Sequence, residues 1–107
     1  MRKVEILMST YNGEKFVEAQ IKSIVQQKNV DIHLTIRDDG SKDDTISIIK
    51  MQQKKYPDRI ALVEGENVGY RKSFLRLLDF AIDADYYGFA DQDDLWKEEK
   101  ISRAVEC

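Results

Sequence analysis

The sequence has few of the residues that define disulfide-rich, membrane-spanning or secreted proteins. Among its 107 residues are one cysteine, one proline and one histidine. The cysteine, Cys107, has no partner within the chain, which excludes an internal disulfide framework and fits a reducing compartment. No apolar run approaches the roughly 20 residues of a membrane-spanning helix, and the N-terminus lacks the longer apolar segment of a signal peptide. We therefore expect a cytoplasmic protein, and leave open a peripheral position at the inner face of the membrane.

Concentrated basic charge and phosphate-binding glycine patterns are also missing. The net charge is −3 and the basic residues are scattered, which is not the pattern of a nucleic-acid-binding face. Residues 9–13 (Ser-Thr-Tyr-Asn-Gly) lack the glycine pattern of a dinucleotide-binding loop or a P-loop. We expect no nucleic-acid partner. No repeat or Pro/Gly-rich linker divides the chain, so we predict one domain over residues 1–107.

Strands and helices are predicted to alternate along this domain. Short apolar runs predict strands at residues 4–8, 32–36, 60–63 and 86–90. Helical spacing of apolar residues predicts helices at 14–27, from Asp43 or Asp44 to Tyr56, around 74–82, and at 97–105. Pro57 ends the second helix. This order implies an α/β fold with a mostly parallel sheet, helices on both faces and a ligand crevice at the carboxyl ends of the strands.

Two acidic segments lie at predicted strand ends. Residues 91–94 (Asp-Gln-Asp-Asp) directly follow the last strand, and clustered carboxylate oxygens of this kind suit Mg²⁺ or Mn²⁺. Residues 38–41 (Asp-Asp-Gly-Ser) end the second strand, where a carboxylate can accept a bond from a base N–H or a ribose hydroxyl. A solvated acidic loop that caps the next helix is the alternative for residues 91–94. Turn and capping chemistry is the simpler explanation of residues 38–41 when that segment is taken alone.

Polar residues at two other predicted strand ends suit a nucleotide. Ser9, Thr10 and Tyr11 offer hydroxyls, N–H groups and a ring, while Asn12 can instead cap the helix that follows. Arg71 or Lys72, near the start of the third helix, would be well placed to meet a diphosphate, with solvated surface charge as the alternative.

Four segments, in this order, resemble glycosyltransferase family 2, whose members have the GT-A fold, and in particular its rhamnosyltransferase-like members. They are residues 8–13 (Met-Ser-Thr-Tyr-Asn-Gly), 38–43 (Asp-Asp-Gly-Ser-Lys-Asp), 67–69 (Asn-Val-Gly) and 89–96 (Phe-Ala-Asp-Gln-Asp-Asp-Leu-Trp). The resemblance implies a nucleotide site made by Ser9, Thr10, Tyr11, Asp39, Lys72, Asp91 and Gln92. It also implies that the Asp-X-Asp motif places Asp93 on an Mn²⁺ or Mg²⁺ ion, with Asp91 near the same ion or the ribose.

The resemblance further implies transfer of a sugar, with inversion, from a UDP- or dTDP-sugar to a hydroxyl of a saccharide or lipid-linked acceptor in polysaccharide biosynthesis. In the family the catalytic base and acceptor-binding half follow the Asp-X-Asp motif, so we expect them beyond Cys107. We therefore expect a truncated, Rossmann-like GT-A domain that is inactive alone and able to dimerise through its uncovered face. A non-catalytic nucleotide- or metal-binding module, or a scaffold fragment, remains the alternative.

Overall fold

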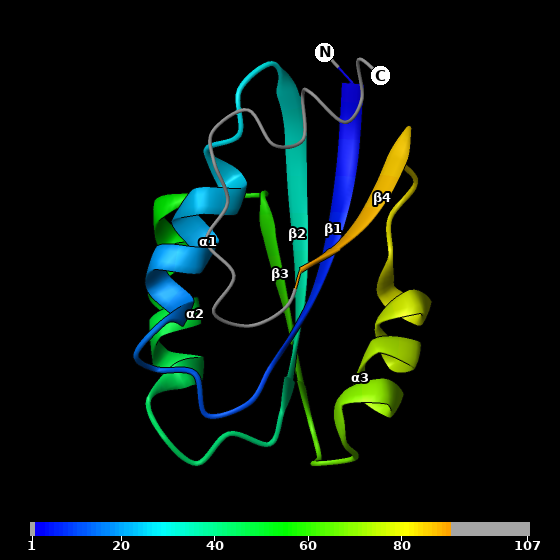
Figure 1. The fold of residues 1–107 in the computed structure, drawn as a ribbon. Helices are drawn as coiled ribbons and strands as arrows, with labels where there is room; N and C mark the ends of the chain where they lie inside the picture. Colours follow the sequence, from blue (N-terminus) through cyan, green and yellow to red (C-terminus); the bar gives the residue numbers. More distant parts are fainter. Residues whose placement is uncertain (1, 91–107) are drawn as a thin grey trace.

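The protein is a three-layer α/β structure, described here for residues 2–90 of a computed structural model; residues 1 and 91–107 lie outside the described part. Four parallel strands form one sheet in the order β3-β2-β1-β4 (Figure 1). The strands are β1 (Arg2–Thr10), β2 (Val30–Asp39), β3 (Ile60–Gly65) and β4 (Tyr86–Ala90). The predicted helix at 97–105 and the acidic segment 91–94 fall outside the described residues.

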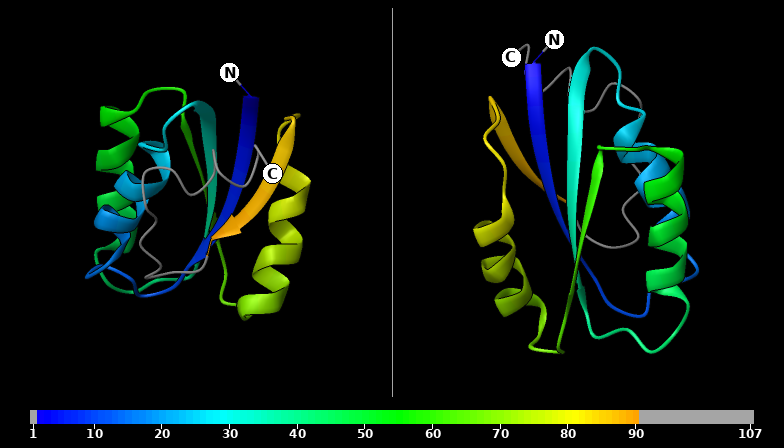
Figure 2. Two further views of the ribbon diagram at one scale, coloured as in Figure 1. Left: turned by 45° about the horizontal axis from the view of Figure 1, so that its top comes forward. Right: turned by 180° about the vertical axis from the view of Figure 1, so that it is seen from behind.

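Helices cover both faces of the sheet, as the sequence predicted. Helices α1 (Val17–Val25) and α2 (Thr45–Lys55) lie on one face, and α3 (Tyr70–Leu77) lies on the other, continued by the 3-10 turn η1 (Leu78–Phe80). All three views show the same arrangement (Figure 1, Figure 2). No helix among residues 2–90 has the length and apolar character needed to cross a bilayer.

The two faces of the sheet differ in chemistry because side chains alternate along each strand. Val4, Ile6 and Met8 of β1 and the even-numbered residues of β2 from Val30 to Ile36 are apolar and pack with α1 and α2 into the hydrophobic core. The odd-numbered residues are largely polar and buried on the side of α3, namely Glu5, Ser9, Thr35, Arg37 and Asp39. The α1–α2 layer is therefore held mainly by apolar packing, and α3 covers a polar network.

Glu5 anchors one end of this polar network. Its side chain is fully buried and accepts bonds from the Thr35 hydroxyl at 3.0 Å and from the Ile82 N–H at 2.9 Å. The ring nitrogen Nδ1 of His33 lies 2.8 Å from its other oxygen. Buried carboxylates need such partners, and these bonds fix the connection between η1 and β4 to the sheet.

Several predicted boundaries differ from the structure. The second strand is longer than predicted, and the first helix begins at Val17 rather than Glu14, because the N–H groups of Phe16 and Val17 both bond to Gly13 in a tight turn. The predicted helix over 74–82 is wrong at both ends: α3 begins at Tyr70 and ends at Leu77. Ile82 then bonds to Glu5 instead of continuing the helix.

The beginning of α2 agrees with the predicted capping chemistry for one of the two aspartates. The carboxylate of Asp43 accepts bonds from the N–H of Thr45, at 3.0 Å, and from the Thr45 hydroxyl. Asp44 occupies the cap position but makes no side-chain capping bond. The helix ends at Lys55, two residues before Pro57, which confirms its predicted end.

Candidate functional site

The carboxyl ends of three neighbouring strands meet at one edge of the sheet. In the parallel register Thr10 of β1 pairs with Asp38 of β2, and Met8 pairs with Ala90 of β4. The chain leaves β1 toward α1 on one face, whereas β4 is reached from α3 on the other face. Ligands of open parallel sheets bind where the connections diverge in this way, so the candidate site lies beyond β1 and its two neighbours.

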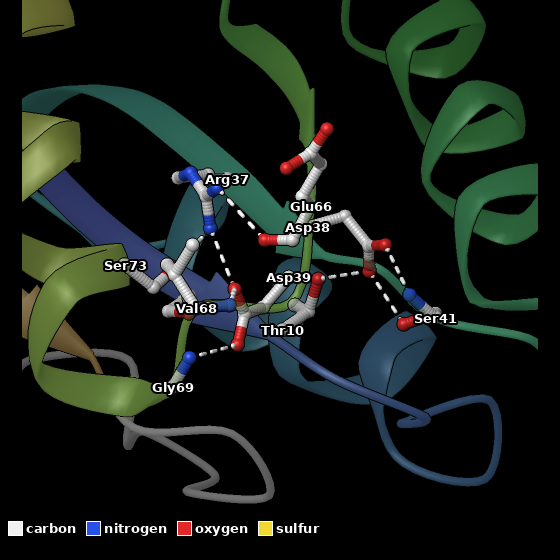
Figure 3. Close-up of polar contacts among 10 residues, drawn as sticks. Thr10, Arg37, Asp38, Asp39, Ser41, Glu66, Val68, Gly69 and Ser73 are labelled. Carbon is white, nitrogen blue, oxygen red and sulfur yellow. Dashed lines mark hydrogen bonds and ion pairs between the residues drawn. The ribbon is translucent and has the colours of Figure 1, made fainter.

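The Asp38 carboxylate holds the end of β1 and the turn after β2 together (Figure 3). Its carboxylate is fully buried and accepts a bond from the Thr10 hydroxyl at 2.8 Å. It also accepts bonds from the backbone N–H of Ser41, at 2.7 Å, and from the Ser41 hydroxyl, at 2.6 Å. These bonds close the turn after β2 and connect it to the end of β1.

Asp39 points to the opposite face of β2, toward α3, because neighbouring residues of a strand alternate. Its Oδ1 atom accepts bonds from Arg37 at 2.8 Å and from the N–H of Val68 at 2.9 Å. Its Oδ2 atom accepts a bond from the N–H of Gly69 at 3.1 Å. Asp39 thus binds the loop that leads into α3, and 4% of its surface remains exposed.

Hydrogen bonds keep Asp39 ionised. Burial raises the pKa of its carboxyl group, but the bonds from Val68, Arg37 and Gly69, together with the positive charge of Arg37, hold the pKa below its ordinary value. A carboxylate that is ionised and fixed in orientation is a strong acceptor for N–H or O–H groups.

Sequence reasoning missed two residues of this network, Arg37 and Ser73. Arg37 is 2% exposed and donates from Nη1 to Asp39 and, at 3.0 Å, to the Ser73 hydroxyl, which lies 2.6 Å from the Ser9 hydroxyl. The Nη2 atom of Arg37 donates to the carbonyl of Glu66 at 3.0 Å. Arg37 stands two positions before Asp39 on the polar, odd-numbered side of β2. This position was the available signal, since residues two apart in a strand share a face.

A second set of bonds joins the loops that follow β1 and β2. The N–H of Asn12 donates to the Ser41 hydroxyl at 2.8 Å, and the side-chain oxygen of Asn12 accepts from the N–H of Lys42 at 2.9 Å. The N–H of Gly13 donates to Thr45 at 2.8 Å. The predicted helix-capping role of Asn12 is therefore wrong: Phe16 stands at the helix cap, and Asn12 bridges the loops instead.

Five of the predicted nucleotide-site residues lie in the described part of the chain: Ser9, Thr10, Tyr11, Asp39 and Lys72. Ser9 and Thr10 are buried at the end of β1, and their hydroxyls bond to Ser73 and Asp38 respectively. Tyr11 is exposed in the turn that follows. Lys72 is exposed in the first turn of α3, next to Ser73. The predicted residues Asp91, Gln92 and Asp93 lie outside the described part of the chain.

The described residues do not by themselves provide a metal site. Within residues 2–90 no three His, Cys, Asp or Glu side chains are grouped so that they could hold an ion. The carboxylates of Asp38 and Asp39 bond to protein donors, which is not the arrangement of a cation ligand. The predicted metal ligands, Asp91 and Asp93, are not among the described residues, so their role stays a prediction.

Comparison with known proteins finds similar sequences over almost the whole chain. The sequence matches the family profile described as Glycosyl transferase family 2 over residues 5–106. The dTDP-rhamnosyl transferase RfbG of Shigella flexneri is 44% identical over 104 residues, a match that covers 94% of this chain and 36% of that protein.

Solved structures share the fold. The mannosyltransferase PcManGT of Pyrobaculum calidifontis, in complex with GDP-Man and Mn²⁺, has a TM-score of 0.86 at 24% identity, over 96% of this chain and 31% of that chain. TarS 1–349 of S. aureus, in complex with UDP, has a TM-score of 0.82 at 23% identity, over 97% and 31% of the two chains. The present chain thus spans about a third of the length of these relatives.

Proposed function

Because this chain belongs to glycosyltransferase family 2 and has the GT-A fold, we propose that it supplies the part of a sugar transferase that binds the nucleoside-diphosphate sugar. One observation carries the proposal: the ends of β1 and β2 place Ser9, Thr10 and Asp39 at the edge where open parallel sheets bind ligands. Ala90, which precedes the acidic segment, pairs with Met8 at the same edge.

Each predicted residue has a role in this proposal. Ser9, Thr10, Tyr11 and Asp39 hold the base and ribose, with Asp39 as the ionised acceptor for an N–H or hydroxyl group. Lys72 and Gln92 complete the donor pocket, and Asp91 and Asp93 hold Mn²⁺ or Mg²⁺. The ion would neutralise charge on the diphosphate leaving group.

The donor in the proposal is a UDP- or dTDP-sugar. Two relatives support this choice, since one is named a dTDP-rhamnosyl transferase and another is solved with UDP. The acceptor is a hydroxyl of a saccharide or of a lipid-linked saccharide. We assign no catalytic base among residues 1–107, and the complete transfer belongs in this proposal to a protein of the relatives' length.

The proposal includes self-association through an apolar surface beside β4. Leu75, Leu78 and Phe89 are 64%, 52% and 58% exposed, and with Arg71 and Phe74 they line one hollow. In the described sheet β4 is an outer strand. Uncovered apolar surface next to an outer strand favours association with a second copy.

Calorimetric titration tests the donor site. UDP and dTDP are titrated into the chain with and without Mn²⁺, alongside Asp93→Ala and a control, Asp83→Ala, which removes one exposed carboxylate before β4. We expect saturable, metal-dependent binding by the wild type and the control, and its loss in Asp93→Ala. Absence of binding by the folded wild-type chain contradicts the proposal.

A further inference from the structure

Arg37 is the most completely buried cation among the described residues, and its position next to the donor site calls for an explanation. A buried guanidinium is stable only when its donors are satisfied and its charge is paired. Arg37 meets this condition through the Asp39 carboxylate, the Ser73 hydroxyl and the Glu66 carbonyl. These partners come from β2, from α3 and from the loop between β3 and α3, so one side chain connects three segments (Figure 3).

The close approach of Arg37 to β3 depends on a glycine. A Cβ atom placed on Gly65 would overlap the guanidinium group of Arg37. Gly65 has no requirement for a left-handed backbone, because its φ lies outside that region. The absent side chain at Gly65 therefore provides the space in which the guanidinium reaches both Asp39 and Glu66.

The arrangement leaves Asp39 with one oxygen able to accept a further bond. Oδ1 already accepts bonds from Arg37 and Val68, whereas Oδ2 accepts one from Gly69 among the described residues. A carboxylate oxygen can accept about two hydrogen bonds, so Oδ2 retains capacity for a ligand N–H or O–H. The bond from Arg37 to Oδ1 determines how the carboxylate plane, and with it Oδ2, is oriented.

We propose that Arg37 is a positioning residue of the donor site: it orients the Asp39 carboxylate and the loop at residues 66–69 for nucleotide binding without contacting the nucleotide itself. This inference rests on the proposed function. Removing the guanidinium would free the carboxylate to rotate and release the Glu66 carbonyl and Ser73 from their common partner. Such an effect acts on affinity through Asp39, whereas a purely structural arginine would act on stability alone.

Arg59 supplies a matched control. Its side chain also donates hydrogen bonds within the protein, from Nε to the Ile32 carbonyl at 3.2 Å and from Nη2 to the Val25 carbonyl at 3.0 Å. Ile32 pairs with Val4, six residues before Thr10, so Arg59 lies at the opposite end of the sheet. Arg59→Met should reduce stability without changing nucleotide affinity.

The experiment compares three substitutions with this control. Arg37→Met removes the charge, Arg37→Lys keeps the charge but loses the fork of donors, and Gly65→Ala displaces an intact guanidinium. Affinity for UDP or dTDP is measured with Mn²⁺ by calorimetry, and folding is verified by thermal unfolding. We expect all three to weaken binding by about tenfold relative to Arg59→Met. In a double-mutant cycle, adding Arg37→Met to Asp39→Asn should weaken nucleotide binding little further, because both substitutions act through one carboxylate.

A second readout requires no nucleotide. The pKa of Asp39 and the amide signals of Val68 and Gly69 are followed by NMR in each variant. We expect the Asp39 pKa to rise and both amide signals to shift in Arg37→Met and Gly65→Ala, but not in Arg59→Met. If the wild type binds no nucleotide, the proposed function fails, and these signals alone decide whether Arg37 positions Asp39. Unchanged signals overturn the inference, as does nucleotide affinity in the Arg37 variants equal to that of Arg59→Met.

Discussion

Asp38 and Asp39 are adjacent in the sequence, yet their carboxylates bind different parts of the molecule. Asp38 bonds to Thr10 and Ser41 on the side of α1 and α2, while Asp39 bonds to Arg37 and to the loop before α3. The first carboxylate holds the ends of β1 and β2 together. The second is, in the proposed function, the one that meets the donor nucleotide.

The substitution Asp38→Asn should therefore reduce stability. All the groups facing Asp38 are donors, namely the Thr10 hydroxyl, the Ser41 hydroxyl and the Ser41 N–H. An amide would turn its own NH₂ group toward at least one of them and leave a buried donor unpaired. We expect a loss of about 1–3 kcal/mol in the free energy of unfolding, measured by urea denaturation. A variant as stable as the wild type would show that these bonds contribute little.

Two substitutions of Asn12 separate the stabilisation by its side-chain hydrogen bond from the cost of its left-handed backbone. Its φ is 48°, and its side chain accepts a bond from Lys42. Asn12→Gly should lose only the hydrogen bond, about 1 kcal/mol, whereas Asn12→Ala should lose about 1–2 kcal/mol more because alanine disfavours a left-handed backbone. Both are measured by urea denaturation.

Asn29 is the control for this pair. Its φ is 62°, in the turn before β2 at the other end of the sheet. Asn29→Ala should show the backbone cost, and Asn29→Gly should be close to neutral. Equal stability of Asn12→Gly and wild type would contradict a stabilising bridge from Asn12 to Lys42.

Stability should fall in acid partly because of Asp39 and Asp43. Burial raises the pKa of both carboxyl groups, but hydrogen bonds from Val68 and Arg37 to Asp39, and from Thr45 to Asp43, hold both pKa values below their ordinary range. A lowered folded-state pKa means that the unfolded chain binds the proton first. The stabilisation is present above about pH 4, the ordinary range of aspartate, and is lost as the pH falls through the folded-state values.

Urea midpoints measured between pH 7 and pH 3 test this dependence. Between pH 7 and pH 3 the urea midpoint of Asp39→Asn should fall less than that of the wild type, because the contribution of the Asp39 carboxylate is absent. The urea midpoint of Asp43→Asn should also fall less, for the same reason. Parallel curves for the wild type and both variants would contradict the assignment.

Self-association should depend on the apolar surface beside β4. Leu78→Glu places a charge in the hollow that Phe74 and Phe89 also line. Met51→Glu makes the same change on α2, where Met51 is 59% exposed. By sedimentation, the wild type and Met51→Glu should form dimers at high concentration and Leu78→Glu should not. A monomeric wild-type chain would contradict the proposed association.

Much of the fold follows from local sequence patterns. Strand β2 and the first two helices contain apolar residues spaced by about 2 or 3.6 residues, and most of these side chains are buried in the structure. Strand β4 was predicted from its apolar residues although Tyr86, Tyr87 and Phe89 are exposed. The third helix was harder to predict because Leu75 and Leu78 are exposed, so only part of its apolar pattern reports contact with the sheet. Its end depends on a long-range bond between Ile82 and Glu5, which no local pattern reveals.

The candidate site was predictable by residue type but not by partner. The acidic turn at the end of β2 was identified, yet the different roles of Asp38 and Asp39 depend on which face each residue occupies. Arg37 and Ser73 were missed because they bond to each other across 36 residues, and Ser73 also bonds to Ser9 across 64 residues. Such contacts arise only when β2, the loop after β3 and α3 are assembled.

Amide NMR mapping tests the central claim, donor binding at the carboxyl ends of the strands, most directly. UDP or dTDP with Mg²⁺ is added to the labelled chain and the backbone signals are followed. Saturable shifts at residues 9–11, 39 and 67–69, with unchanged signals at Val30 and Arg59 at the other end of the sheet, are the predicted result. A folded chain whose signals do not respond, or respond only around Val30 and Arg59, would contradict the account.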